Sequence, residues 1–339
     1  MRRLPDKIAR TWRNKRVFIL TDSNVERLWG RKLQLAMHNA GSDVLLLSFP
    51  AGEESKRHTV VHALHTQLLT HGVRRDSVIV ALGGGVVGDV AGFVAATVLR
   101  GVAFLQVPTT LLAQVDSSVG GKVGINHPRG KNLIGAFYQP RGVFVDPEVL
   151  RTLPAREFRS GLAEVVKIAA ALDRPFFKFL EQKARMITKE NLPLLEKIIA
   201  HAVGLKARIV RRDEFENATR KILNLGHTLG HAIEAATDFS LRHGEAVAIG
   251  LAAEARIAVR SGLLPAREGE RLIALLKTLQ LPTRIPSVRD TRRLYAALAA
   301  DKKALDDHTS FVLLRGIGRP VVGVHVPQHE IEFQLHVSQ

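Results

Sequence analysis

Histidines and a carboxylate at spacings that suit a metal ion lie in the second half of this chain. His227 and His231 stand four residues apart, so a helix would place both imidazoles on one face. His243 supplies a third imidazole, and Glu164 is a carboxylate among apolar neighbours that needs a partner if buried. The 339 residues include no cysteine, so a metal would need histidine and carboxylate ligands, a set typical of zinc. The spacing leaves open whether His231 is a ligand and whether the pair is simply two core histidines. The identity of the metal is also open, because cobalt suits the same donors.

Five cations, each of which could alone be a surface charge, together favour an anionic small molecule as substrate. Lys122 and Lys131 stand beside glycines, where a lysine can reach an anion close to the backbone. The other three lie in predicted helices with apolar faces: Lys167, Lys206 and Arg220. If the five converge, they would bind phosphate or carboxylate groups.

A glycine cluster follows the apolar run 77–82 and comprises Gly83, Gly84, Gly85 and Gly88. A buried strand, a glycine turn and a helix together present backbone N–H groups to a phosphate. The acid that usually holds the ribose about twenty residues later is missing, which weakens an ordinary Rossmann interpretation. A membrane span over residues 81–99 is disfavoured by five glycines and by the charge of Asp89.

The predicted strands of the first half alternate with helices, which predicts a parallel sheet with helices on both faces. They cover residues 16–21, 43–49, 77–82, 102–107 and 143–145. Ligands bind beyond the carboxyl ends of such strands, where Asp22, the glycine cluster and Thr109-Thr110 should converge. Asp22 could hold a ribose hydroxyl or cap a helix, and Glu53 and Lys56 could reach a nucleotide or remain surface charges.

After about residue 153 the pattern becomes helical, so we expect an α/β domain over residues 1–153 and a mainly α-helical domain over residues 154–339. The predicted helices cover residues 161–180, 192–210, 219–236, 243–261 and 266–279. A hairpin of residues 311–314 and 321–326 should precede a last helix.

The formal charge of +17 raises the possibility of nucleic-acid binding. However, the arginines are scattered and aromatic residues make up only 5%, so there is no stacking platform. A basic enzyme that attracts an anionic substrate explains the charge better. The basic N-terminus has no apolar core typical of a secretory signal, so we expect a cytoplasmic protein that binds neither nucleic acid nor membrane.

Long motifs along the chain resemble 3-dehydroquinate synthase, of the sugar-phosphate cyclase group. They are GGGVVGDVAGFVAATVLRG, VPTTLLAQVDSSVGGKVGIN, GKNLIGAFYQP, GLAEVVK, NLGHTLGHAIE and HGEAVA. The resemblance extends from TDSNVERLW to DKKALDD and implies a Rossmann-like NAD-binding domain followed by a helical metal- and substrate-binding domain.

The resemblance implies a phosphate-eliminating lyase of the shikimate pathway, which supplies aromatic amino acids. It would convert 3-deoxy-D-arabino-heptulosonate 7-phosphate into 3-dehydroquinate and phosphate, through transient oxidation by NAD, phosphate elimination, re-reduction and an intramolecular aldol closure. NAD would be regenerated, and one zinc ion would polarise the oxidised hydroxyl.

Carried over position by position, the resemblance implies Glu164, His227 and His243 as metal ligands and His231 as an active-site histidine that is not a ligand. Implied cofactor contacts are Asp22, Asn24, Glu53, Lys56, Gly85, Gly88, Asp89, Thr109, Thr110, Asp116 and Lys131. Implied catalytic and substrate-binding residues are Lys122, Asn132, Lys167, Lys206, Arg220, Asn224 and one of Lys302 and Lys303. Arg100 resembles an arginine lent across a homodimer interface to the substrate phosphate.

Two alternatives remain on the same scaffold. Another cyclase, such as 2-deoxy-scyllo-inosose synthase, would share most of these residues, although Arg220 and Asn224 suit the carboxylate that only the heptulosonate carries. A metal-dependent polyol dehydrogenase would consume NAD stoichiometrically and need fewer cations.

Overall fold

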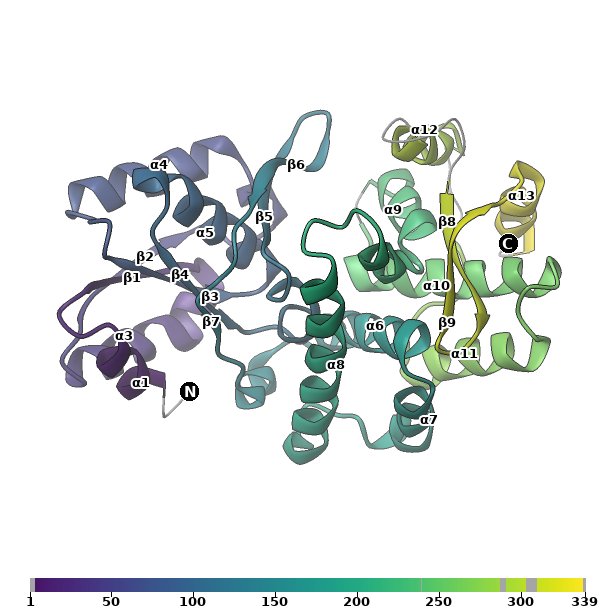
Figure 1. Cartoon of the computed structure of the whole chain (residues 1–339), viewed down its shortest axis with the longest axis horizontal. Helices are drawn as coiled ribbons and strands as arrows, with labels where there is room; N and C mark the ends of the chain where they lie inside the picture. The colour runs from purple at the N-terminus through teal and green to yellow at the C-terminus, as the bar shows by residue number, and fades with distance from the viewer. Residues whose placement is uncertain (1–3, 239, 287–290, 303–309, 338–339) are drawn as a thin grey trace. The chain divides into compact units, whose positions relative to one another are not determined.

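A computed structural model describes residues 4–238, 240–286, 291–302 and 310–337 of the chain (Figure 1). The chain forms two compact units, Met1–Leu153 and Pro154–Gln339. Each unit has its own architecture.

The first unit is built on a five-stranded sheet with the order β2-β1-β3-β4-β7, in which all neighbours are parallel. The strands are β1 (Arg16–Asp22), β2 (Asp43–Phe49), β3 (Val78–Gly83), β4 (Ala103–Pro108) and β7 (Gly142–Val143). The strand order reverses between β1 and β3, where Thr21 pairs with Leu82 at the carboxyl ends. In an open parallel sheet this reversal opens a crevice for a ligand.

Alternate residues of β1 pack on opposite faces of the sheet, as the twofold repeat of a strand requires. Phe18 and Leu20 join a core with helices α4 (His58–Thr70) and α5 (Gly85–Thr97). Val17 and Ile19 join a second core with α1 (Leu4–Thr11) and α3 (Arg31–Asn39), so helices cover both faces (Figure 1). A short α2 (Ser23–Val25) continues into a π-helical turn, Glu26–Gly30.

The segment after β4 contains structure that the sequence analysis did not predict. A π-helical turn, Ala113–Ser117, is followed by an antiparallel hairpin of β5 (Lys122–His127) and β6 (Gly130–Phe137). Only Val123 and Ile125 of this hairpin are buried hydrophobics, so its apolar pattern is too short to signal two strands.

The second unit is mainly helical and carries one antiparallel hairpin, β8 (Ser310–Gly316) with β9 (Arg319–His325). Its helices are α6 (Ala155–Leu172), α7 (Arg174–Lys183), α8 (Leu192–Arg212), α9 (His227–Ala236), α10 (His243–Arg260), α11 (Ala266–Thr278), α12 (Thr291–Lys302) and α13 (Gln328–Val337). The predicted α/β fold followed by a helical part is confirmed.

Two predicted helices are each divided in the structure. The helix expected over residues 161–180 breaks at Asp173, whose carboxylate accepts a hydrogen bond from Phe176 N at 2.8 Å and so caps α7. The helix expected over residues 219–236 is a 3-10 segment, Thr219–Asn224, followed by α9. Gly226 separates the two, with a φ of +78° that helical backbone does not adopt.

The apolar stretch at residues 81–99 contributes a buried strand end and the 13-residue helix α5. Within the described residues, every helix is too short or too polar to cross a membrane.

Candidate active site

Three imidazoles and a carboxylate meet in the second unit. The ligand atoms of His227, His231 and His243 all lie within 4.8 Å of one another. Glu164 Oε1 lies 3.6 Å from His227 Nε2 and 3.4 Å from His243 Nε2. Glu164 is fully buried, whereas His231 is exposed.

Three helices carry these groups to one place. Glu164 lies in the middle of α6, which buries its side chain. His227 is the first residue of α9 and His243 the first residue of α10. His231, one turn after His227, has its ring centroid 5.2 Å from that of His227 and 5.7 Å from that of His243.

Electrostatics gives these groups different protonation states. Burial alone would raise the pKa of the Glu164 carboxyl, but the Lys167 ammonium and the two imidazoles hold that pKa well below its ordinary value. Burial and the Lys167 charge lower the pKa of His227 well below its usual range, which leaves a neutral imidazole with a lone pair. The Glu164 and Glu234 carboxylates overcome burial and raise the pKa of His243 to about 10.

The donor set fits a divalent metal ion. Glu164 Oε1 is buried and, within the described part of the chain, has no hydrogen-bond partner of suitable geometry. A buried carboxylate oxygen whose hydrogen bonds are incomplete is a candidate to coordinate a cation. The Nε2 atoms of His227 and His243 lie beside that oxygen, and two imidazoles with one carboxylate form a common zinc ligand set.

Glu234 supports this cluster and was not predicted from the sequence. Its Oε2 lies 3.1 Å from Nδ1 of His243, and the residue is 3% exposed. A carboxylate on the far nitrogen of a ligating histidine orients the ring and raises its basicity. The seven residues from His227 to Glu234 place both on one face of α9, but this spacing does not reveal its partner His243, which lies on α10.

Predicted substrate-binding cations of the second unit are buried. Lys167 is 2% exposed, with Nζ 2.5 Å from Glu164 Oε2. Lys206 is 6% exposed on α8, and Arg220 is 3% exposed in the 3-10 segment, where it donates to the Glu214 carbonyl at 2.6 Å. Asn224, in the same segment, donates to Glu216 Oε1 at 3.0 Å.

The remaining predicted substrate residues lie elsewhere. Lys122 lies on β5 and Asn132 on β6, so both belong to the first unit, as does Lys131 of β6, a predicted cofactor contact. Lys303 lies outside the described residues, and of Lys302 only its place at the end of α12 is described.

The first unit places a glycine turn at the carboxyl ends of β1 and β3, where the strand order reverses. Helix α5 begins at Gly85, directly after β3. A Cβ added at Gly84 would lie 3.0 Å from Thr110 Cγ2, so the bare backbone is part of the packing there. Such a turn at a helix N-terminus fits the pyrophosphate of a dinucleotide. Asp22, at the end of β1, caps α2 by accepting from Asn24 N and Val25 N at 2.9 Å.

A polar cluster joins the predicted cofactor residues on three elements. Lys56, 4% exposed, pairs with Asp89 of α5 at 2.6 Å and also donates to the Asn132 side chain. Glu53 Oε1 accepts from Asn126 Nδ2 at 2.8 Å. The hairpin that the sequence analysis missed therefore connects the segment before α4 to α5.

The turn after β4 holds the other predicted cofactor residues. Thr109 N donates to the Gly83 carbonyl at 2.9 Å, which joins this turn to the glycine cluster. Thr110 Oγ1 accepts from Ala113 N at 3.1 Å. Two buried atoms of the π-helical turn region, Gln114 Oε1 and Ser118 Oγ, have no hydrogen-bond partner within the described residues. Unsatisfied polar atoms at a π-helical segment are typical of a ligand site. Asp116 lies in the same turn.

Two other predicted cofactor residues lie on neighbouring elements. Gly88 is part of α5, and Asn24 Oδ1 accepts a hydrogen bond from Arg27 at 2.8 Å.

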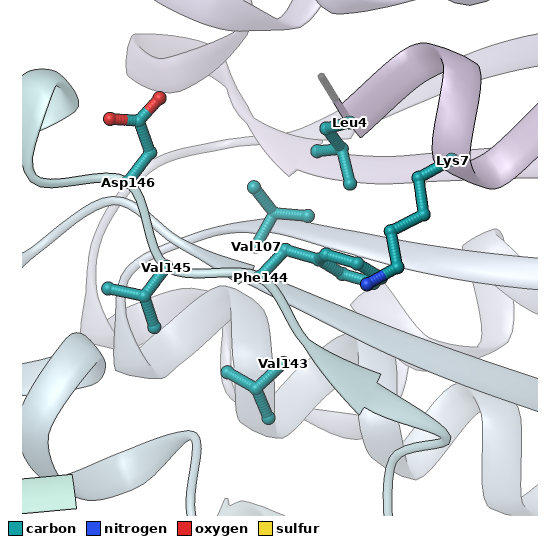
Figure 2. Close-up of a pocket in the computed structure, with 7 residues that line it drawn as sticks. All are labelled: Leu4, Lys7, Val107, Val143, Phe144, Val145 and Asp146. Atoms are coloured by element: carbon teal, nitrogen blue, oxygen red, sulfur yellow. The ribbon is translucent and has the colours of Figure 1, made fainter. Parts of the chain in front are cut away.

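A separate pocket of the first unit lies where α1 meets the ends of β4 and β7 (Figure 2). Its lining is mainly apolar, and the Lys7 amine lies over the Phe144 ring, 5.2 Å from the centroid. Asp146 points away from that pair (Figure 2). The pocket contains none of the predicted cofactor, substrate or metal residues.

Known proteins match this chain over most of its length. Residues 46–160 match the family model for the 3-dehydroquinate synthase N-terminal part, and residues 161–304 match that for the C-terminal part. The 3-dehydroquinate synthase of Pelobacter propionicus is 50% identical over 308 residues, which cover 91% of this chain and 86% of the relative.

Two solved structures share the fold. A 2-epi-5-epi-valiolone synthase from Streptomyces hygroscopicus with NAD+ and Zn2+ bound has a TM-score of 0.89 and 30% identity, covering 95% of this chain and 90% of its own. A 2-deoxy-scyllo-inosose synthase complexed with carbaglucose-6-phosphate, NAD+ and Co2+ has a TM-score of 0.89 and 29% identity, covering 99% and 95%. From its motifs, its fold and these matches across both halves, this chain belongs to the 3-dehydroquinate synthase family.

Proposed function

We propose that the chain catalyses the reaction of its family, the conversion of 3-deoxy-D-arabino-heptulosonate 7-phosphate into 3-dehydroquinate and phosphate. The observation that carries the proposal is the cluster of Glu164, His227 and His243 in the same unit as three buried cations. A substrate with both a carboxylate and a phosphate is complementary in charge to these buried cations.

The chain's own residues would bind and orient this substrate. Arg220, with Asn224 beside it in the 3-10 segment, would bind the carboxylate, because a guanidinium matches a carboxylate in two parallel hydrogen bonds. Lys206 and Lys167 add buried positive charge on α8 and α6. His231 is the exposed imidazole of the cluster and would move a proton at the substrate, while the other two histidines serve as ligands.

The residues described above fit both cofactors of the proposal. Glu164, His227 and His243 would hold one divalent ion, zinc or cobalt, and the crevice at β1 and β3 would hold NAD. When bound, NAD supplies a reversible hydride acceptor and the ion polarises the hydroxyl that is oxidised. Lys56, Asp89 and Glu53 lie in the cluster proposed to contact NAD.

The choice of substrate rests on relatedness and on Arg220. The curated relative from Pelobacter propionicus is 50% identical, whereas the two cyclases of known structure are 29% and 30% identical. A buried guanidinium such as that of Arg220 favours a substrate that has a carboxylate.

We further propose a homodimer in which Arg100 contacts the substrate phosphate of the partner subunit. Arg100 is exposed, and Leu99 and Arg100 have φ values of +51° and +65°. Two consecutive non-glycine residues in this region are strained, and such strain is common where a side chain is held for function.

The test is phosphate release from the heptulosonate phosphate, measured together with absorbance of NADH. The proposal expects one phosphate and one 3-dehydroquinate per turnover without net NADH. Net NADH would instead identify a dehydrogenase, and turnover of glucose 6-phosphate would identify a different cyclase. Glu164→Gln should abolish turnover and lower the bound metal, because it removes the ligand charge. The exposed Glu196→Gln is the matched control and should change neither.

A further inference from the structure

A buried carboxylate outside the ligand set lies at the start of α9. Glu254 belongs to α10 and is 1% exposed. Its Oε2 accepts from Gly226 N at 2.6 Å, and its Oε1 lies 3.5 Å from Leu229 N. These are among the backbone N–H groups that a helix leaves unsatisfied in its first turn. The α9 helix therefore receives its N-terminal cap from a neighbouring helix, and Gly226, which precedes α9, provides no side-chain cap.

The two helices approach at backbone distance beside this carboxylate. A Cβ added at Gly250 would lie 2.0 Å from the Gly226 carbonyl oxygen and 3.0 Å from Gly230 N. Gly250 and Glu254 are one turn apart, so they share a face of α10. Backbone contact and carboxylate together hold the first turn of α9 against α10.

This contact determines where two of the proposed ligands lie. His227 follows Gly226 directly, and His243 is the first residue of the helix that carries Glu254. We propose that Glu254 is a positioning residue, which clamps the first turn of α9 so that His227 and His243 both reach Glu164. The inference rests on the metal site proposed above.

Positioning and simple capping differ in what they predict. A cap alone stabilises the fold, and its loss lowers stability without a specific effect on the metal. A clamp also sets the distance between ligand atoms, which are now 3.6 Å and 3.4 Å from Glu164 Oε1. A small displacement of α9 moves His227 Nε2 but not His243, so the geometry of the bound ion changes.

The experiment uses the full chain loaded with Co2+, whose visible absorption reports ligand geometry. Glu254→Met replaces the carboxylate with a side chain of similar size that has no oxygen to accept the N–H groups of α9. Glu254→Gln keeps one oxygen that can accept them. Leu180→Ala, at a fully buried position of α7, is the matched control for lost stability. Co2+ affinity is measured by competition with a chelating dye, and unfolding temperature is measured without metal.

The expected result for Glu254→Met is a Co2+ affinity weaker by about tenfold or more, within the range for partners of metal ligands, together with an altered Co2+ spectrum. Glu254→Gln should restore most of the affinity, and Leu180→Ala should lower the unfolding temperature but keep the affinity within about twofold, well below that range. If Glu254→Met does not fold, Glu254→Asp, which withdraws the carboxylate by one methylene, carries the same expectation.

A Glu254 variant that is less stable but keeps the Co2+ affinity and Co2+ spectrum of the parent would show that Glu254 only caps the helix. That result would overturn the inference. Equal weakening by Leu180→Ala would also overturn it. Failure of the parent chain to bind Co2+ would instead remove the metal site itself, and the inference with it.

Discussion

Individual side chains in the second unit form a buried cluster of opposite charges. Glu164 is fully buried and stays ionised through its neighbours, with Lys167 on one oxygen and two imidazoles near the other. Removing one member of such a buried cluster leaves the others uncompensated, so single substitutions here affect both folding and function. Metal content and unfolding temperature therefore need to be measured together with activity.

Arg220 is the residue that most directly tests the substrate. Arg220→Leu should raise the KM for the heptulosonate phosphate about 10- to 100-fold, because a hydrogen bond to a charged group contributes about 1.5–3 kcal/mol. NAD affinity should not change, since Arg220 and the proposed NAD residues lie in different units. Arg211→Leu, an exposed arginine of α8, is the control. An unchanged KM in Arg220→Leu would exclude a carboxylate contact.

Glu254 gives the stability of the metal-free chain a pH dependence. Burial raises the pKa of Glu254 to about 8 from an ordinary value of 4.5, although the Gly226 and Leu229 N–H groups oppose this shift. The folded chain then holds the proton more tightly than the unfolded chain, so this group's contribution to stability falls as pH rises between these values.

In Glu254→Gln an amide that does not titrate replaces the carboxyl group. This variant should therefore lack the pH dependence that Glu254 gives to the free energy of unfolding. We expect the free energy of unfolding of Glu254→Gln, relative to the parent, to increase steadily as pH rises from about 5 to about 8. Urea unfolding of the metal-free proteins across this range measures the difference. A difference that is independent of pH would contradict the raised pKa.

At the scale of elements, close helix contacts bring the proposed metal ligands together. Gly244, next to His243, donates its N–H to Ser160 Oγ at 3.1 Å. A Cβ at Gly244 would lie 1.9 Å from the Ser160 carbonyl oxygen, which is helix backbone and cannot move aside cheaply. Ser160 lies one turn before Glu164 on α6, so this contact relates the carboxylate ligand to His243.

Gly244→Ala should therefore destabilise the chain by about 1–3 kcal/mol, the cost of overpacking, and weaken metal binding. Gly204→Ala is a matched control within α8, where the added Cβ meets only the tip of Arg208 at 4.0 Å. The control should stabilise by about 0.5–1 kcal/mol, since alanine suits a helix interior better. Chemical unfolding and chelator competition measure both effects, and equal stability of the two variants would refute the contact.

At the scale of the whole molecule, the proposed homodimer makes a prediction about mixed subunits. Arg100→Ala and Lys167→Ala should each be nearly inactive alone. In a hybrid dimer, the subunit with intact Lys167 would receive Arg100 from its partner, so one of two sites would work. Random mixing makes half of the dimers hybrid, and the mixture should recover about a quarter of parent activity. No recovery, with hybrids verified by mass, would exclude a shared arginine.

The positive charge is also a property of the whole chain. Its formal value is +17, and the predicted site residues account for only nine of the 49 lysines and arginines. A positive surface raises the encounter rate with an anionic substrate and makes that rate sensitive to salt.

Local sequence patterns and motifs predicted the strands of the sheet and several residues of the candidate site. The apolar runs predicted the five parallel strands, because a buried strand needs a continuous apolar sequence. The glycine cluster predicted the turn before α5, and the motifs with Glu164, His227 and His243 singled out three groups that the structure brings together.

Long-range contacts decided the rest, because a side chain's partners depend on where distant helices meet. The sequence left Asp22 as a ribose contact or a helix cap; the tertiary structure shows that it caps α2, and its contact with a ribose stays a prediction. The sequence left the i, i+4 pair ambiguous, whereas the fold buries Glu164 next to His227 and His243 and leaves His231 exposed. Glu234 and Glu254 were missed because their partners, on α10 and α9, are set by helix packing and not by a sequence period.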